Sequence, residues 1–520
     1  MFHRYYESGY DTALAGAFSC DVPALTTLWR KAQRTLYVNM RDSWMDCPDR
    51  ERSQWTFDVA MDVHQAFYGL GTEAHQLSRK WIRELTAWQK VDASSPAYEP
   101  AYAPFSLYAP VPGHWVDELP NQSLQSIAYG FWTYFTHTGD VATMREMLPA
   151  VVRYLLSYTV SSTPGIPGGG LVVPRACPGQ PHAADVQCSG IWDWCDGQST
   201  NCDYAPIDNA WYFWAINSTL QIARAVNATR PGGEATPAEL AELSQRRDAL
   251  RNGFATFWDP ECGCYRSQAH RDRPGGTTTC ATKADNCTLP DDRVNGLAVV
   301  TGLAPAARWA SIARNVLDLS STTAVAFGST AMEKFTLEAM FLAGEHDAAL
   351  ARMQHRFGPM IRSKLSTLWE HWDVDPATGA PFAGYNHGWS GGALVLLSKY
   401  VAGLSPTTPG WSTFDVRPEL GTTLRKASAT VATVHGTITV EVERHGSAKV
   451  VVRAEVPRGT VARLKLSAAL VGPGARITIY PAGAPTAAAA TSAGATGADA
   501  VTPAGLRLPP GSWAIEAGSV

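Results

Sequence analysis

The sequence predicts an α-helical domain followed by an antiparallel β-sandwich. Helical periodicity begins at Val22 and dominates until Gly403, after which short alternating segments replace it. The chain has 520 residues, too many for one ordinary hydrophobic core, so at least two domains are expected. We therefore expect a short lead-in with a remnant strand at 1–15, a helical domain at 16–403 and a β-sandwich domain at 404–520.

Apolar residues recur with a helical period in twelve segments of the first domain. The expected helices lie near residues 22–40, 55–70, 72–90, 120–138, 140–159, 206–228, 236–257, 289–302, 304–319, 328–344, 346–360 and 387–402. Two connections, 90–119 and 161–206, are long, aromatic and rich in glycine and proline. Loops of this length in a compact domain are usually functional or disordered, so we expect them to border a binding site.

Period-two alternation punctuated by glycine and proline predicts the strands of the second domain. The expected strands lie at 430–434, 437–442, 449–454, 462–467 and 476–480, with a last strand near Trp513. The tract 482–500 consists largely of alanine, glycine and threonine and is expected to be a loop.

Composition excludes several classes of partner. Hydrophobic residues make up 45% of the chain, as in a soluble globular protein, and the net charge of −4 comes with no basic stripe for nucleic acid. No apolar run is long enough to span a membrane, and the N-terminus lacks the apolar core of a signal peptide. Eighteen tryptophans are compatible with a sugar-binding pocket or with core packing. The oligomeric state is left open.

The ten cysteines divide into two groups. Cys20 and Cys47 fall in segments expected to be packed, and we expect them to be free thiols. The other eight lie in two loop regions, at Cys177, Cys188, Cys195, Cys202, Cys262, Cys264, Cys280 and Cys287. An even number in such loops predicts disulfides and a secreted or extracytoplasmic protein. Zinc is the alternative, but no CxxC or HxxxH pattern accompanies them, so no metal or cofactor is expected.

The stretch 46–58, DCPDRERSQWTFD, carries the strongest functional signal. Five of its first seven residues are charged, and Pro48 favours a loop or a helix start. Interleaved arginines can hold one carboxylate ionised while a neighbouring carboxyl stays protonated, as acid–base chemistry requires. A salt-bridged helix cap is the competing interpretation.

This stretch resembles the signature DCPxRERxxWTGD of the family-78 glycoside hydrolases, the α-L-rhamnosidases, with Phe57 where the family has glycine. The resemblance extends to 366–373, STLWEHWD, which is similar to TTxWERWD, and to 385–388, YNHG, which is similar to NHYA. It continues into the second domain at HGTITVEVER. The resemblance implies that the twelve helices form an (α/α)6 barrel and that the substrate is a carbohydrate, a rhamnoside or a rhamnose-containing glycan.

By the same resemblance Glu51 is the general acid and Glu370 the general base of an inverting hydrolysis. An inverting pair predicts a carboxyl separation of roughly 6.5–9.5 Å. Gln125 falls where the family has an acidic residue. The residues that the resemblance places around the sugar are Asp46, Arg50, Trp55, Asp58, Gln125, Trp192, Asp193, Trp194, Trp369 and His387.

Two other functions remain open at this point. A polysaccharide lyase on the same barrel would act next to a uronic acid, and His387, Tyr385 and Arg50 could serve it. A non-catalytic glycan-binding protein is the other, although binding alone does not require both Glu51 and Glu370.

Overall fold

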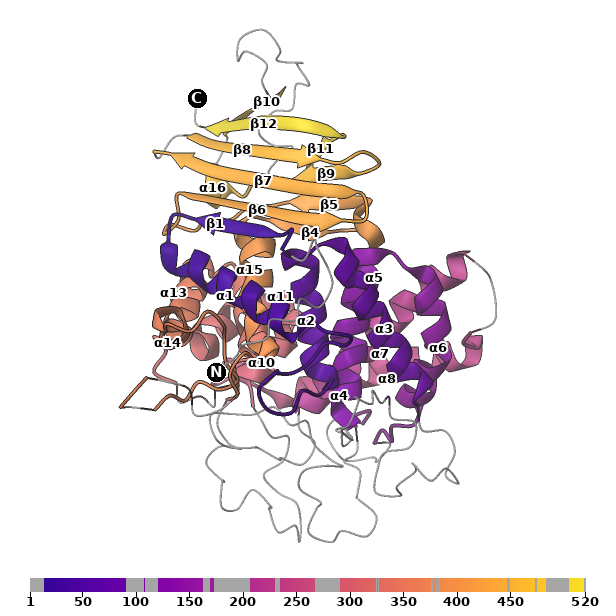
Figure 1. The fold of residues 1–520 in the computed structure, drawn as a ribbon. Helices are drawn as coiled ribbons and strands as arrows, with labels where there is room; N and C mark the ends of the chain where they lie inside the picture. The colour runs from indigo at the N-terminus through magenta and orange to yellow at the C-terminus, as the bar shows by residue number, and fades with distance from the viewer. Residues whose placement is uncertain are drawn as a thin grey trace, which may run out of the picture.

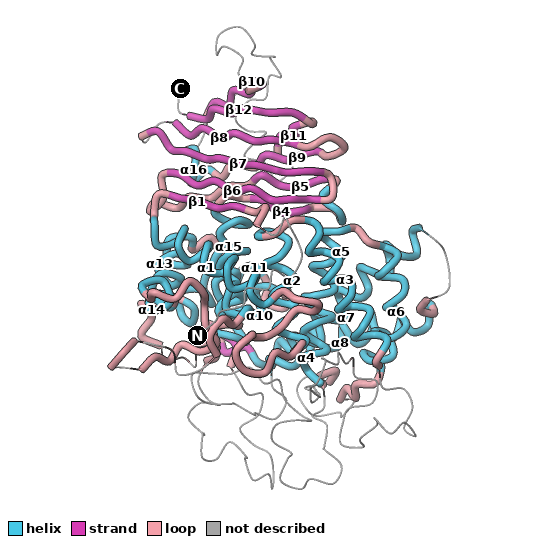
Figure 2. The backbone as a smooth tube through the Cα atoms, in the orientation of Figure 1, coloured by secondary structure: helices cyan, strands magenta, loops and turns pink. Residues whose placement is uncertain are grey.

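The computed structural model describes residues 14–89, 107, 120–161, 169–172, 206–229, 234–266, 290–323, 325, 327–375, 377–379, 381, 384–446, 449–472, 475–482 and 505–518. Helices and strands are segregated: the helices form one body and the strands lie at one end of it (Figures 1 and 2). This confirms the predicted order of a helical barrel domain followed by a sheet domain.

The helical domain contains long helices joined by short 3-10 and π-helical turns. Its first half comprises α1 (Pro23–Asn39), α2 (Thr56–Gly69), η1 (Thr72–Ala74), α3 (His75–Ala87), α4 (Pro120–Gln125), η2 (Ser126–Phe131), α5 (Trp132–Thr138), α6 (Val141–Leu156) and α7 (Pro206–Thr229). Its second half comprises α8 (Pro237–Phe254), η3 (Ala255–Phe257), α10 (Asp292–Val300), α11 (Ala306–Ile312), η4 (Ala313–Leu317), α12 (Glu333–Leu342), α13 (His346–Arg356), α14 (Gly358–Arg362), η5 (Gly388–Gly391), α15 (Gly392–Leu396) and η6 (Leu397–Val401). A two-stranded ribbon of β2 (Trp258–Asp259) and β3 (Cys264–Tyr265) follows η3.

Helix α2 lies inside the barrel, whereas α3 lies on its outside. Every residue of α2 is buried, including Asp58 and Asp62. In α3 only one face is buried, with Leu77, Trp81 and Leu85 at helical spacing, and its other face is charged. An inner helix therefore brings polar side chains into the barrel interior, where the cost of burial requires them to be paired or neutral.

The sheet domain consists of a six-stranded and a four-stranded sheet. The first has the order β1-β6-β7-β8-β12-β10 and the second β11-β9-β5-β4. The strands are β1 (Ala17–Cys20), β4 (Leu404–Pro406), β5 (Thr413–Val416), β6 (Lys426–Thr433), β7 (Gly436–His445), β8 (Lys449–Val456), β9 (Val461–Leu464), β10 (Arg476–Pro481), β11 (Leu506–Leu508) and β12 (Gly511–Gly518), with η7 (Pro409–Trp411) and α16 (Ala468–Val471) between them. All pairs are antiparallel except β5 with β9, a parallel pair that the predicted antiparallel sandwich did not include.

The first strand belongs to the last domain. β1 pairs in antiparallel register with β6, with Ala17 opposite Thr430 and Cys20 opposite Ala427. The sequence placed this segment in the barrel as the entry to its first helix, and the remnant strand expected at 1–15 falls almost entirely outside the described residues. The described chain therefore runs along the edge of the sheet before it enters the barrel.

Several predicted helices are divided. The helix expected at 120–138 is α4, the π-helix η2 and α5, and the one expected at 346–360 breaks at Gly358-Pro359 into α13 and α14. Pro359 has no backbone N–H with which to continue α13 and fits the first turn of α14, which accounts for the second break.

Cys20 and Cys47 are free thiols, as expected. Cys262 and Cys264 form a disulfide, and the other loop cysteines lie outside the described residues. Among the helices described, none combines the length and the apolar character that crossing a membrane would require.

Candidate active site

The loop between α1 and α2 carries the first candidate carboxylate. Asp46 is fully buried in this loop, where its Oδ1 accepts the Ser53 backbone N–H at 2.7 Å and its Oδ2 accepts the Cys47 thiol at 3.1 Å. The Asp46 carbonyl accepts from Asn39 Nδ2 at 3.1 Å, which joins the loop to the end of α1. These bonds close the loop on itself and present Glu51 on its outer side, where 31% of the glutamate side chain is exposed.

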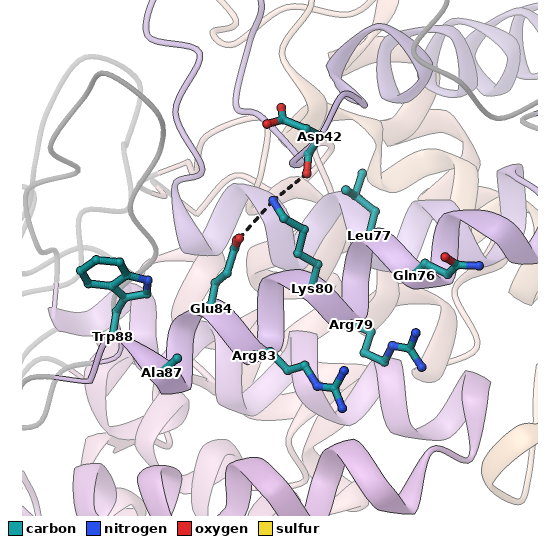
Figure 3. Close-up of a pocket in the computed structure, with 9 residues that line it drawn as sticks. All are labelled: Asp42, Gln76, Leu77, Arg79, Lys80, Arg83, Glu84, Ala87 and Trp88. Carbon is teal, nitrogen blue, oxygen red and sulfur yellow. Dashed lines mark hydrogen bonds and ion pairs between the residues drawn. The ribbon is translucent and has the colours of Figure 1, made fainter.

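Helix α3 holds this loop from outside (Figure 3). Lys80 Nζ donates to the Asp42 carbonyl at 2.7 Å and pairs with Glu84 at 3.0 Å. Glu84 in turn accepts a hydrogen bond at 3.0 Å from Nε2 of Gln54, which follows Glu51 by three residues. The contacts of α3 with Asp42 and Gln54 therefore hold both ends of the loop in place.

The second candidate carboxylate comes from a segment that folds back on itself. The Glu370 N–H donates to the Gly384 carbonyl at 2.9 Å, and the His387 N–H donates to the Leu368 carbonyl at 3.0 Å. The Gly388 N–H then reaches the Asp46 carbonyl at 3.2 Å. This pairing places Glu370 and His387 beside the first loop.

Arg50 connects the two carboxylates. Its Nη2 atom lies 2.8 Å from Glu51 Oε1 and 2.9 Å from Glu370 Oε2, so these two oxygens are at most about 5.7 Å apart. Arg50 thus joins its chain neighbour Glu51 to Glu370, which lies 320 positions after Arg50. The expected separation of roughly 6.5–9.5 Å is not reached between these two oxygens while both pair with Arg50.

The environment of Glu370 favours its ionised form. Burial alone would raise the pKa of Glu370, but the hydrogen bond from His371 and nearby positive charge, including Arg50, outweigh it and lower the pKa to about 2. His387 is buried, and burial lowers its pKa to about 3, so its ring is neutral near neutral pH. Its Nδ1 lies 3.6 Å from Asp58 Oδ1. Glu370 is therefore ionised at neutral pH, as a group must be before it can accept a proton, although the cation beside it weakens it as a base.

Three further acids lie beneath this pair. Burial raises the pKa of Asp46 to about 7, and Glu51 adds to the rise. Burial and the charge of Asp46 likewise raise the pKa of Asp58 and of Asp62 well above the usual range. Neutral carboxyl groups at these positions avoid placing several like charges together in the barrel interior.

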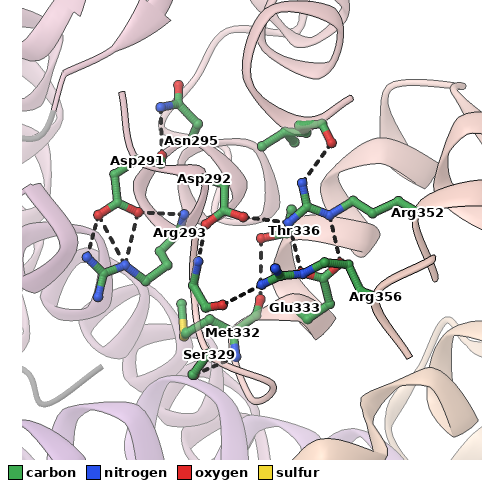
Figure 4. Close-up of polar contacts among 12 residues, drawn as sticks. Asp291, Asp292, Arg293, Asn295, Ser329, Met332, Glu333, Thr336, Arg352 and Arg356 are labelled. Atoms are coloured by element: carbon green, nitrogen blue, oxygen red, sulfur yellow. Dashed lines mark hydrogen bonds and ion pairs between the residues drawn. The ribbon is translucent and has the colours of Figure 1, made fainter. Parts of the chain in front are cut away.

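A buried ion network lies behind the segment that carries Glu370 (Figure 4). Arg352 of α13 bonds Glu333 at 2.7 Å and Asp292 at 2.5 Å. Asp292 accepts the Gly328 N–H at 2.8 Å, and Arg356 donates to the Gly328 carbonyl at 2.9 Å. Both backbone groups of Gly328 are therefore anchored.

The anchored segment holds the backbone around Glu370. Trp372 Nε1 donates to the Gly328 carbonyl at 3.0 Å, and Thr330 Oγ1 donates to the Glu370 carbonyl at 2.5 Å. Trp389 Nε1 donates to the same carbonyl at 3.2 Å. The backbone at Glu370 is thus held by the segment before α12, which α13 anchors, and by η5.

Among the described residues, one group could offer metal ligands. Single ligand atoms of Asp46, Cys47 and His387 lie within 4.8 Å of one another. However, the Cys47 thiol donates a hydrogen bond to Asp46, and burial raises the pKa of this thiol to about 12. A protonated thiol is a poor ligand, so the group is better described as a hydrogen-bonded pair next to a neutral histidine.

Of the remaining predicted site residues, one contacts Glu51, two are buried and three lie outside the described residues. Trp55 donates from Nε1 to Glu51 Oε2 at 2.5 Å and so touches the candidate acid. Gln125 and Trp369 are buried, at the end of α4 and beside Glu370. The segment 192–194, with Trp192, Asp193 and Trp194, lies outside the described residues.

Sequence reasoning missed two residues of the site. His371 contacts Glu370 Oε1 at 3.3 Å, and its adjacency in WEHW is the signal that could have indicated it. Asp62 lies one helical turn after Asp58 on α2, a spacing that places both on one face.

The comparisons with known proteins agree with this geometry. Residues 13–401 match the model of the bacterial α-L-rhamnosidase six-hairpin glycosidase domain, and residues 403–471 match that of the bacterial α-L-rhamnosidase C-terminal domain. A search of curated proteins by sequence finds no match.

Solved structures share the fold at low identity. A GH78 rhamnosidase of Bacillus sp. GL1 is 21% identical with a TM-score of 0.69, covering 89% of this chain and 44% of its own. The α-L-rhamnosidase of Dictyoglumus thermophilum is 15% identical with a TM-score of 0.67, covering 98% and 51%. That of Streptomyces avermitilis, solved with L-rhamnose, is 18% identical with a TM-score of 0.67, covering 97% and 42%.

The chain spans about half or less of the length of each of these structures. The family model, by contrast, covers most of the chain and includes both candidate carboxylates. The chain therefore belongs to the family of bacterial α-L-rhamnosidase six-hairpin glycosidase domains.

Proposed function

We propose that this protein is an inverting glycoside hydrolase that removes terminal α-L-rhamnosyl residues from glycosides or polysaccharides. The observation that carries the proposal is the pairing of Glu51 and Glu370 on one nitrogen of Arg50, because hydrolysis of a glycosidic bond needs two carboxyl groups close together. Membership of the family supports the choice of sugar.

The two carboxyl groups have different surroundings, which support different proposed roles. Glu370 is buried and ionised, and once Arg50 turns away it loses a cation that lowers its pKa and can serve as the base that takes a proton from water. Glu51 is the more exposed of the two, with 31% of its side chain accessible against 5% for Glu370, and it donates to the leaving oxygen. Trp55 fixes the orientation of Glu51 through one carboxyl oxygen.

Inversion also requires Arg50 to release one carboxylate. Two carboxylates held by a single nitrogen leave no room for a sugar carbon and a water between them. The Arg50 side chain is 41% exposed and can turn outward as the sugar enters. Before substrate binds, Arg50 holds Glu51 and Glu370 in place through its two ion pairs.

The buried acids have a supporting role in this proposal. Asp46 is inaccessible and is committed to Ser53 and Cys47, so it shapes the loop that carries Glu51. Asp58 and His387 form a polar floor under Glu370. The walls of the sugar site are proposed to include Trp192, Asp193 and Trp194.

We propose an extracytoplasmic location. The Cys262–Cys264 disulfide supports it, because such bonds persist in oxidising compartments. The sequence contains four Asn-x-Ser/Thr triplets, and two of them do not contribute, since Asn217 and Asn227 lie half-buried within α7 rather than in a surface loop.

The test is release of p-nitrophenol from its α-L-rhamnoside by the wild type, Glu51→Gln and Glu370→Gln. Both variants should lose at least about a thousandfold in kcat, whereas Glu441→Gln, an exposed ion-paired glutamate of β7, should keep full rate. Proton NMR of the first product should show β-L-rhamnose. A wild type that releases no rhamnose, or that produces an ultraviolet-absorbing unsaturated sugar from polysaccharide, would contradict the proposal.

A further inference from the structure

A second cavity lies at the other end of the barrel from the two carboxylates. It has a volume of about 620 Å³ and is lined by residues of α2, α7, α12, η6 and the turn after β4. Helix α2 shows the separation: Asp58 stands at its catalytic end, whereas Tyr68 lines the cavity ten residues later, roughly 15 Å along the axis. The strand β4 marks this end, where the barrel meets the sheet domain (Figure 1).

The cavity holds one net positive charge. Glu338 accepts from Lys399 Nζ at 2.7 Å and from the Tyr400 hydroxyl at 2.8 Å, and it also pairs with Lys334. Lys334 is almost fully buried, and burial lowers its pKa to about 8, so it is charged at neutral pH. His64 adds no charge because burial lowers its pKa well below the usual value.

Two lysines thus share one carboxylate. Each ammonium group has three N–H donors, and within the described part of the chain the only oxygen partner of Lys334 or Lys399 is Glu338. Lys334 also lies 4.4 Å above the Tyr129 ring. Donors and positive charge therefore remain available to an anion in the cavity.

Other polar groups of the wall are also available. The amides of Asn217 and Gln221 and the indole N–H of Trp132 and Trp214 bond no other described residue. Trp214 is held in place by stacking on Trp211, with the rings 5.4 Å apart and 5° from parallel. Amides beside fixed aromatic rings suit a ligand with hydroxyl groups and an apolar ring face.

We propose that this cavity is a non-catalytic binding site for a carbohydrate of one or two rings that carries a carboxylate, that is, a uronic acid. The carboxylate pairs with Lys399 and Lys334, the hydroxyls bond Asn217 and Gln221, and the ring lies against Trp214. The volume falls within the usual range for small-ligand sites, which often lie between domains. The site does not depend on the hydrolytic activity.

The experiment is isothermal titration calorimetry of the whole chain with sodium D-glucuronate, and with D-glucose as the neutral counterpart. Each titration is done without and with L-rhamnose in excess, which occupies the proposed catalytic site. Glucuronate should bind at one site per chain, and glucose at least about tenfold more weakly, because it lacks the charge.

Two variants and a control locate the site. Lys399→Met should weaken glucuronate binding at least about tenfold, and Asn217→Ala about threefold to tenfold. Lys399 is partly exposed, and Glu338 keeps Lys334 and Tyr400 in the variant, so the fold should persist. Lys449→Met removes a lysine that pairs with Glu516 on the sheet domain and should leave binding unchanged.

Results of three kinds would overturn the proposal. One is the absence of saturable heat with glucuronate in the wild type. Another is equal affinity for glucuronate and glucose, or unchanged binding by a folded Lys399→Met. The third is loss of the glucuronate signal when rhamnose is present, which would assign the binding to the catalytic end. None of these depends on whether the aryl rhamnoside is hydrolysed, so the two proposals can fail separately.

Discussion

Gly384 should be indispensable for the position of the proposed base. Its φ is +63°, and a Cβ built on it would lie 2.1 Å from Glu370 Oε2 and 2.5 Å from Glu370 Cβ. Side-chain Cβ atoms do not approach other atoms within 3.0 Å, so Gly384→Ala must move the Glu370 carboxylate by about 1 Å. A displacement of this size at a reacting group costs roughly a hundredfold in rate, or about 2.7 kcal/mol.

Gly379 provides a matched control. Its φ is +67°, close to that of Gly384, but no described atom would lie within 4 Å of a methyl group at this position. Alanine at either site should cost about 1–2 kcal/mol of stability through the left-handed backbone. Only Gly384→Ala should also lose activity.

The assay is kcat and KM for the aryl α-L-rhamnoside together with thermal unfolding of both variants. We expect similar unfolding temperatures and a roughly hundredfold lower kcat for Gly384→Ala alone. Equal activities of the two variants would refute the reasoning, because the steric contact with Glu370 would then have no effect on catalysis.

Three further perturbations follow from the contacts of the site. Asp46→Asn should flatten the pH dependence of the free energy of unfolding. Burial raises the pKa of Asp46 from 3.8 to about 7, so the folded wild type holds this proton more tightly than the unfolded chain does. The wild type therefore loses up to about 4 kcal/mol of stability as the pH rises between these two values. Thermal unfolding at about pH 4 and pH 8 measures this, and parallel curves for variant and wild type would contradict it. Arg352→Met should lower stability by about 3–5 kcal/mol at neutral pH, because it removes the cation that pairs with buried Asp292 and leaves Glu333 with Arg356 alone. The loss should be smaller at acid pH, where the carboxyl groups are protonated, and denaturant unfolding at both pH values checks it. Trp55→Phe removes the N–H that bonds Glu51 and should lower kcat about tenfold with little change in unfolding temperature; an unchanged kcat would show that the bond does not matter.

The sequence predicted most of the barrel because local patterns specify its helices. Helix α1 is marked by Pro23 in its first turn and by apolar residues at helical spacing, which the structure buries. Helix α2 runs from residue 56 to residue 69, close to the expected 55–70. The pairing of β5 with β9 and the membership of β1 in the last sheet could not be predicted, because nothing local distinguishes a strand's distant partner.

The candidate site was predicted unevenly for a similar reason. Glu51 and Glu370 were indicated by motifs, and the structure brings them to one guanidinium. The hydrogen bond from Trp55 to Glu51, the contact of His371 with Glu370, and the neutral state of Asp62 depend on side-chain geometry and burial in the folded barrel. Sequence spacing specifies residue types but not these distances.

The pairing of β1 with β6 has a consequence for the order of folding. Ser19 and Ser428, whose hydroxyls lie 2.8 Å apart, are separated by 409 positions, so this edge of the sheet cannot close until β6 has been synthesised. Because synthesis proceeds at about 5–20 residues per second, the backbone donors of β1 stay without their β6 partners for on the order of half a minute. Proteases and chaperones that recognise extended, unpaired segments thus have a defined interval in which to act on the nascent chain.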